Sequence, residues 1–264
     1  MTHTITSICA YHNCLSERKM NMRFYKSSSW LDRAWGSNVI HKRQPVLILD
    51  QNCLTIVIMP LSGIAMRMHK SECRVIPPQP TQSVAVLVPD HLRAYIHRCV
   101  SLGLRECCMA IDIMSKTITV IHEMPTAVCK QVWSDVVFTD DTYYIEERPE
   151  DISMQICTKE WCDVWALVPR RGHVTLQTKA GKRTFTLTHD TNTWCAAIHV
   201  KAAPSKDGVG CFSCKDMAKV MSYAARCDSG ASWSELTCMA VGVLRWSNRL
   251  MDGTQQCVYV APVQ

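Results

Sequence analysis

The chain lacks the motifs that most enzyme families carry. Its 264 residues contain no Gly-rich phosphate-binding loop, no dinucleotide-binding fingerprint, no G-x-S-x-G turn around a nucleophile and no His-Glu-x-x-His metal motif. Only 10 glycines are present, and most of them fall in expected turns. No nucleophile and base occur in a pattern that favours catalysis. We therefore predict no catalytic residue, no cofactor and no enzymatic activity. A hydrolase whose site is assembled from dispersed residues is the alternative.

Long apolar runs are also absent. No run approaches the roughly 18 residues that a membrane helix requires, and the first residues lack the basic and apolar regions of a signal peptide. The apolar fraction of 47% and the charged fraction of 20% are typical of a packed globular protein. We expect no membrane partner. The net charge of +6 is compatible with a polyanionic partner and also with many soluble proteins.

Cysteine is abundant, with 16 residues scattered through apolar segments. Such cysteines are typical of small buried side chains in a reducing compartment. A zinc site could begin at Cys211 and Cys214, but no second pair follows at a suitable spacing, and Cys227 and Cys238 are isolated. We predict core thiols and no metal site.

A long internal repeat organises the chain. Three strand-like runs, a fourth run, a helix and further strands occur in the same order in both halves. Val46 and Val174, at matching places, are 128 positions apart, and Val84 and Gly210 are 126 apart. This period is too long for a solenoid and indicates two similar domains. Each domain is expected to place two helices on antiparallel sheet, which is an α+β arrangement.

An acidic segment, FTDDTYYIEERPED, lies between the halves. It is typical of an exposed connector, and a metal or acid/base role for Asp140 and Asp141 is the less favoured interpretation. The predicted domains are 1–138 and 152–264, with the connector at 139–151.

The helix faces suggest contact with phosphates. In the last helix, Lys215, Lys219, Ser222 and Arg226 fall on one narrow stripe at about 100° per residue. The helix after Pro89 places Leu92, Tyr95, Ile96 and Cys99 inward and Arg93, His97 and Arg98 outward. Arg33 belongs to the first helix, and Arg170 and Arg171 follow the third. A basic stripe is often only a solvated face. Two stripes at equivalent places of a repeat favour non-specific binding to a nucleic-acid backbone.

The order of elements from about Met22 to Gln264 resembles the sliding-clamp superfamily of proliferating cell nuclear antigen (PCNA). The segments VWSDVVFTDD, GCFSCKDMAKVMSYAARC and CVYVAPVQ carry the resemblance. It implies that the helices line the interior of a ring around double-stranded DNA, with the sheets outside. It also implies two further subunits, a clamp loader, and client proteins with short hydrophobic motifs.

The C-terminal CVYVAPVQ is similar to the Tyr-x-Ala-Pro ending of the replicative clamp, which borders a groove for client peptides. By position, the resemblance implies a groove made by the following residues: Tyr143, Tyr144, Ile145, Tyr259, Ala261 and Pro262. For Tyr259, packing on an edge strand is an equally good interpretation.

Other segments are similar to the Rad-nine subunit of the nine-one-one checkpoint clamp. They are ECCMAIDIMSKTITVIHEMPTAVCKQVWSDVVF, FSCKDMAKVMSYAA and NRLMDGTQQCVYVA. This similarity and the basic charge favour a nuclear, heterotrimeric checkpoint clamp that tethers repair and signalling proteins. A divergent replicative clamp forming a homotrimer is the alternative. A β-rich interaction scaffold that never contacts DNA is the alternative of another class.

Overall fold

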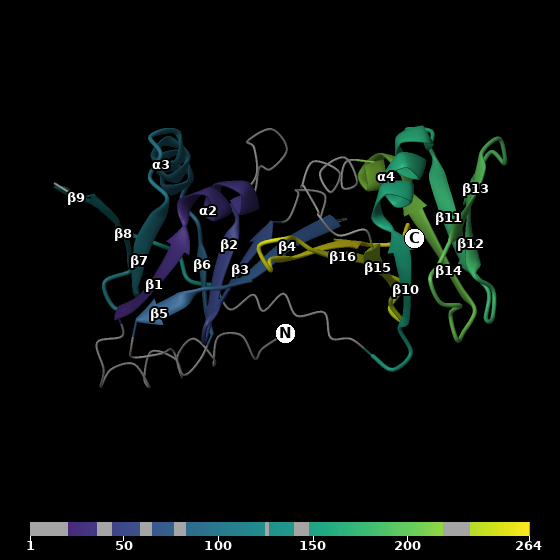
Figure 1. The fold of residues 1–264 in the computed structure, drawn as a ribbon, viewed down its shortest axis with the longest axis horizontal. Coiled ribbons are helices and arrows are strands. Elements are labelled where there is room, and N and C mark those ends of the chain that lie inside the picture. Colours follow the sequence, from purple (N-terminus) through teal and green to yellow (C-terminus); the bar gives the residue numbers. More distant parts are fainter. Residues whose placement is uncertain are drawn as a thin grey trace. The chain divides into compact units, whose positions relative to one another are not determined.

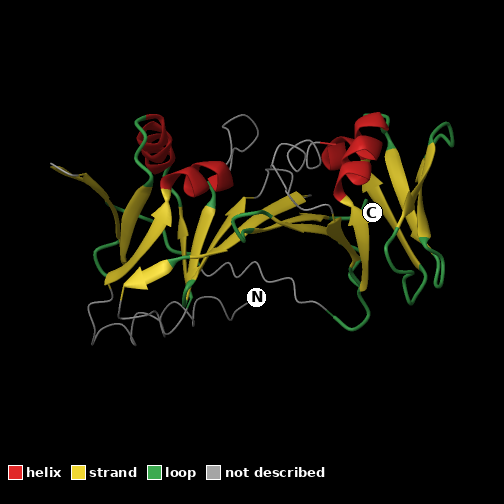
Figure 2. Cartoon of the chain, in the orientation of Figure 1, coloured by secondary structure: helices red, strands yellow, loops and turns green. Residues whose placement is uncertain are grey.

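The computed structural model describes residues 21–35, 44–58, 65–76, 83–124, 127–139, 148–218 and 233–263. These segments form short helices and antiparallel sheets, with several strands between one helix and the next (Figures 1 and 2). The chain divides into two compact units, the first formed by residues 1–58 and 70–144, the second by residues 59–69 and 145–264. The main division, after residue 144, falls in the expected connector. The domain ranges 1–138 and 152–264 stay a prediction.

In the first unit, a five-stranded sheet has the order β5-β1-β7-β8-β9. Its strands are β1 (Asn21–Ser27), β5 (Arg74–Ile76), β7 (Glu106–Asp112), β8 (Thr117–Met124) and β9 (Ala127–Trp133). Buried and less buried side chains alternate from Met22 to Tyr25 in β1 and from Thr117 to His122 in β8. This alternation is expected when only one face of a sheet meets the core. Phe24, Met109 and Val120 lie opposite one another on the buried face.

Three more strands of this unit, β6 (Val84–Leu87), β2 (Val46–Asp50) and β3 (Cys53–Ile58), pair in the order β6-β2-β3 at one end of an eight-stranded sheet. The strand β4 (Ala65–Glu72), which follows β3 in the sheet order, belongs to the second unit over residues 65–69. The helices α2 (Ser28–Trp35) and α3 (Asp90–Ser101) pack with both sheets around one core. Trp30, Leu31 and Trp35 from α2 and Leu92 and Ile96 from α3 are almost fully buried in it. These helices form because their apolar residues recur at a spacing of three to four.

The second unit repeats this plan. Its strands in the eight-stranded sheet follow the order β10-β15-β16-β17, formed by β10 (Ile152–Cys157), β15 (Trp233–Cys238), β16 (Leu244–Arg249) and β17 (Gln255–Val260). The other has the order β13-β12-β11-β14, formed by β11 (His173–Thr178), β12 (Thr184–His189), β13 (Cys195–His199) and β14 (Gly208–Ser213). Helix α4 (Thr158–Leu167) and a helical segment at residues 214–218 complete the unit.

An aromatic cluster anchors α4 in the core of the second unit. The rings of Trp161 and Trp165, one helical turn apart, meet edge to face with centroids 5.4 Å apart. Phe185 of β12 lies 6.0 Å from Trp161. Burying large rings contributes much of the apolar burial that a unit of this size can achieve.

The predicted α+β class with two similar halves is confirmed. The strands expected in the two triplets are present, and their orders match, β4-β3-β2-β6 in one half and β13-β12-β11-β14 in the other. The run ELTCMAVGVL (235–244) predicts one strand by its composition, and that prediction is wrong, because Gly242 (φ +84°) turns the chain between β15 and β16.

Within the described segments, no helix is long and apolar enough to cross a membrane. The described cysteines form no disulfide, and Cys107, Cys214 and Cys257 are buried thiols as expected. Burial raises the pKa of Cys107 to about 12 and that of Cys214 to about 11.

Candidate nucleic-acid interface

Helix α3 carries exposed basic residues in the first unit. Leu92, Ile96 and Cys99 face the core as predicted, and His97 and Arg98 are exposed on the opposite side. Arg33 of the neighbouring helix α2 is also exposed. The two helices lie on the same side of this unit (Figure 1). Their outer sides therefore form one surface, to which three of the predicted residues contribute.

Arg93 was expected on this surface, and the structure differs. Its side chain is only 12% exposed, and its guanidinium group lies 3.7 Å from Asp90. The reason is angular, because one residue of an α-helix turns only about 100°. Arg93 directly follows the buried Leu92, so it lies at the border of the buried face.

Two basic residues of the helix surfaces are paired with acids of the same surfaces. His97 Nδ1 lies 3.1 Å and 3.3 Å from the two carboxylate oxygens of Asp32. On α4, the ammonium group of Lys159 contacts Asp163 at 2.5 Å. Such exposed pairs contribute little to stability, but they reduce the positive field that a phosphate backbone would meet. Arg98, Arg170, Arg171 and Lys215 make no ion pair within the described segments.

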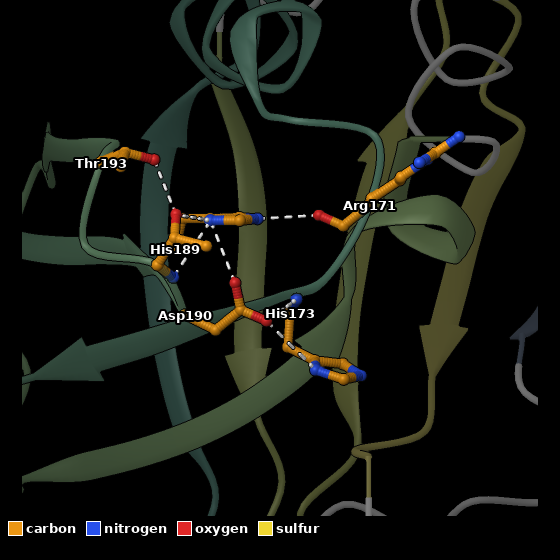
Figure 3. A network of polar contacts seen from close by, with 6 residues as sticks. Arg171, His173, His189, Asp190 and Thr193 are labelled. Atoms are coloured by element: carbon orange, nitrogen blue, oxygen red, sulfur yellow. Dashed lines mark hydrogen bonds and ion pairs between the residues drawn. The ribbon is translucent and has the colours of Figure 1, made fainter.

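In the second unit, Arg170 and Arg171 are exposed in the turn between α4 and β11, and a polar network holds this turn (Figure 3). The Nε2 atom of His189 donates to the backbone carbonyl of Arg171 at 2.7 Å. The Nε2 atom must carry the hydrogen, since a carbonyl only accepts. Asp190 Oδ1 lies 3.0 Å from the other ring nitrogen, and Oδ2 accepts from the backbone N–H of His173 at 3.0 Å.

The hydroxyl groups of Thr191 and Thr193 extend this network. Thr191 Oγ1 lies 2.7 Å from His189 Nδ1 and 2.6 Å from Thr193 Oγ1. Meanwhile the side chain of Arg171 points away from the network (Figure 3). The network therefore fixes the backbone of the turn and leaves the guanidinium group outside it.

Gly172 allows the network to close. Its φ is +83°, and a Cβ atom there would lie 2.7 Å from Asp190 Oδ2 and 2.9 Å from His189 Nε2. Its carbonyl accepts from the backbone N–H of Cys214 at 3.1 Å, which ties the turn to the helical segment 214–218. Sequence reasoning missed this network. The available signal was the pair of histidines at the ends of neighbouring strands next to a glycine.

The helical segment 214–218 agrees with the predicted start of the last helix. Cys214 and Met217 are fully buried, and Lys215 is exposed. The predicted residues Lys219, Ser222 and Arg226 lie outside the described residues. Their stripe stays a prediction.

The predicted peptide groove is described only at its C-terminal side, since Tyr143, Tyr144 and Ile145 lie outside the described residues. Tyr259 is 9% exposed and lies opposite Arg245 on the neighbouring strand. Burial raises the pKa of Tyr259 to about 12, although the positive charge of Arg245 acts to lower it. The Tyr259 ring is thus largely packed in the sheet. The strand β17 is not an edge strand, because β16 lies on one side and β4 on the other.

Beyond β17 the chain end is held on the second unit. The backbone N–H of Val263 donates to the carbonyl of Cys211 at 2.8 Å. The ring of Pro262 closes over Gly242, where a Cβ atom would be 3.2 Å from Pro262 Cγ. Val241 beside this turn is 50% exposed, and Ala261 and Pro262 are partly exposed. The arrangement leaves a small apolar surface at the C-terminal turn.

No group of three or more potential metal ligands occurs among the residues that the structure describes, Cys211 and Cys214 included. Cys227 lies outside them. The described surfaces can offer cations to a phosphate backbone and apolar contacts to a peptide. Whether the chain has enzymatic activity is untested, so its absence stays a prediction.

No protein-family model matches the chain, and no curated protein is similar to it in sequence. Its fold is similar to the crystal structure of proliferating cellular nuclear antigen from Entamoeba histolytica, with a TM-score of 0.60 and 12% sequence identity. The match covers 94% of this chain and 100% of that one. The chain therefore has a PCNA-like clamp fold, as its sequence predicts.

Proposed function

We propose that the chain is one subunit of a ring-shaped clamp that encircles double-stranded DNA and tethers other proteins to it. The observation that carries the proposal is the clamp fold over nearly the whole chain. The exposed cations Arg98, Arg171 and Lys215 on or beside the helices support it. No base-reading motif accompanies these side chains, so their contacts are to phosphates. Binding to DNA is therefore independent of base sequence and sensitive to salt.

Open sheet edges support assembly into a ring. Within the described segments, residues 137–139 cover part of β6, residues 200–201 cover part of β10, and Val263 covers part of β14. The edge strands β5, β9 and β13 have no such cover among the described residues, and β9 with seven residues and β13 with five are the longer ones. An uncovered strand can add a strand from another chain.

The internal repeat indicates which edges would pair. In the second unit β17 occupies the place that β9 has in the first, and β13 occupies the place of β4. Since β17 and β4 are neighbours in one sheet, β9 of one subunit is expected to pair with β13 of the next. Head-to-tail pairing of this kind closes into a ring when the rotation per subunit allows it.

The charges on these edges favour different partners over identical ones. β9 carries Lys130 and no acidic residue. β13 contains no lysine, arginine, aspartate or glutamate, and Lys201 lies two residues after its end. A copy of this chain therefore offers Lys130 no opposite charge, although opposite charges across strands contribute to pairing. We assign the chain to a heterotrimeric, nuclear checkpoint clamp opened by a loader.

The subunit composition is tested by light scattering on the purified chain, alone and with two different clamp-like chains. We expect a monomer alone and a three-chain ring in the mixture. Val132, 46% exposed on β9, gives an edge variant, Val132→Lys, that should weaken assembly at least about tenfold. Met251→Lys, at an 87% exposed apolar residue outside both edges, is the matched control. A stable homotrimer of the single chain would instead identify a replicative-type clamp.

The DNA contact is tested by reversing Arg98, Arg171 and Lys215 to glutamate. The salt dependence of binding to a duplex should lose about 2 to 3 from its logarithmic slope, because about three phosphate contacts disappear. The control reverses Lys179, Lys182 and Arg183, three exposed cations at the other end of β11. Equal losses in both variants would indicate only a general charge effect, and no loss in either would favour a scaffold without DNA contact.

The groove for client peptides is part of the proposal. Pro262→Ala should weaken binding of a short hydrophobic peptide and leave the melting temperature nearly unchanged, because Pro262 is partly exposed. Tyr259→Ala should lower the melting temperature, because Tyr259 is only 9% exposed and its removal leaves a cavity. If the Pro262→Ala variant binds the peptide as tightly as the unaltered chain, the proposed peptide groove at the C-terminal turn is wrong.

A further inference from the structure

The face of the five-stranded sheet away from the core of the first unit carries an unusual row of side chains. Because the strands are in register, Arg74, Tyr25, Cys108, Ile121 and Lys130 lie directly opposite one another from β5 to β9. We call these residues the outer row. The core residues Phe24, Met109 and Val120 alternate with them on the other face. The outer row therefore does not belong to the helix surface considered for DNA.

The outer row has cations at its two ends and apolar side chains between them. Arg74 and Lys130 are exposed, Tyr25 and Ile121 are partly exposed, and Cys108 is buried. With about 4.8 Å between neighbouring strands, the two cations are separated by roughly 19 Å. A helix of about 13 residues covers that length at 1.5 Å per residue.

The next row adds a cation and more apolar surface. There Arg23 lies opposite Ile76, and Val132 on β9 is 46% exposed. Arg23, Arg74 and Lys130 make no ion pair with any residue that the structure describes. Unpaired cations beside exposed apolar side chains attract an acidic partner with apolar residues of its own.

The contacts of Tyr25 argue against a nucleic acid here. The Arg74 guanidinium carbon lies 4.2 Å from the centre of the Tyr25 ring, so that ring face is already covered and cannot stack on a base. Burial raises the pKa of the Cys108 thiol, and the charges of Arg23 and Arg74 oppose that rise. In addition, Glu106 and Glu123 are exposed at one end of the same face. They would repel a continuous polyanion, whereas a peptide can place its carboxylates at separate points.

We propose that the outer row is a docking surface for an acidic amphipathic helix of a partner protein, with carboxylates at both ends of its apolar face. The apolar face covers Ile121 and Val132, and the terminal carboxylates pair with Arg74 and Lys130. This surface is separate from the proposed DNA contact and from the C-terminal turn. It shares the strand β9 with the proposed ring edge, so peptide binding is measured on the single chain.

The test uses the full chain and a labelled synthetic helix of about 14 residues, with glutamates at both ends and leucines on one face, followed by fluorescence anisotropy. We expect binding at micromolar concentrations, weakened at least about tenfold by Arg74→Glu with Lys130→Glu. A second peptide with lysines in place of the glutamates should bind this double variant better than the unaltered chain. Lys182→Glu with Arg183→Glu, the same charge change in the second unit, is the control and should leave binding within about twofold.

Three results would overturn the proposal. They are a dissociation constant weaker than about 1 mM for the acidic peptide, equal effects of the two double variants, and displacement of the peptide by single-stranded oligothymidine with the same sensitivity to Arg74→Glu. Circular dichroism of each variant confirms that folding is unchanged, as expected for exposed positions.

Discussion

Replacing Gly172 by alanine separates backbone strain from the polar network that holds the Arg170–Arg171 turn. A non-glycine residue in the left-handed region costs about 1–2 kcal/mol. At Gly172, with φ +83°, the added Cβ atom would also lie 2.7 Å from Asp190 Oδ2 and displace that carboxylate. Losing a hydrogen bond to a charged group costs about 1.5–3 kcal/mol more. We therefore expect a total loss of about 2.5–5 kcal/mol.

Gly181 provides the matched control. Its φ is +73°, and no atom lies within 4 Å of the position that a Cβ atom would take. Gly181→Ala should therefore cost only the strain of about 1–2 kcal/mol. Urea denaturation of both variants measures the difference, which we expect to be about 2 kcal/mol. Equal losses within about 0.5 kcal/mol would refute the role of the network.

DNA binding provides a second readout for the same pair of variants. A displaced Asp190 releases the backbone of His173 and loosens the turn that carries Arg171. Gly172→Ala should weaken duplex binding in the same direction as Arg171→Glu, and Gly181→Ala should not. An unchanged affinity for Gly172→Ala, measured below its unfolding range, would show that the turn needs no fixed geometry to contact phosphates.

Three further changes have distinct expected outcomes. Asp32→Asn releases His97 and removes a negative charge, so duplex binding should rise about twofold at low salt and be unchanged at high salt; no rise would argue against contact through this face. Burial raises the pKa of Cys238 from 9.0 to about 11, so folding holds this thiol neutral and stability falls as pH rises from about 9 to 11. Cys238→Ala should remove about 2 kcal/mol of that loss in denaturant titrations at both ends of the range, and an unchanged pH dependence would contradict it. Trp161→Ala should destabilise the second unit by about 3–5 kcal/mol in the same assay; a loss below about 1 kcal/mol would contradict the packing described.

The repeat and fold class could be predicted because alternation and turn residues are local signals. β8 shows this clearly, since its buried and less buried residues alternate from Ile118 to His122. The strands β1 and β10 were not predicted. Each runs directly into a helix, α2 or α4, and the helical spacing of apolar residues hides the short alternation before it. Gly242 was also overlooked as a turn, and two strands were therefore joined into one.

The candidate site was less predictable because it depends on angles and on contacts far apart in the sequence. Arg93 shows the angular limit, because it follows Leu92 by only about 100° and so borders the core. Histidines at or near strand ends are by default structural and hydrogen-bonded, and His122 and His189 follow this pattern. Sequence reasoning could not show that His189 reaches Arg171, because only tertiary structure joins the two.

The uncovered β13 edge has a consequence for the chain when its partners are scarce. Cys195 and Ala197 on this strand are exposed, and the strand carries no charged lysine, glutamate or aspartate that would deter wrong pairing. β9 at least has Lys130 at its centre, which acts against aggregation. In the assembly proposed above, a surplus of this chain over its partners should therefore aggregate through β13. The amount of usable protein in a cell would then follow the supply of its partners.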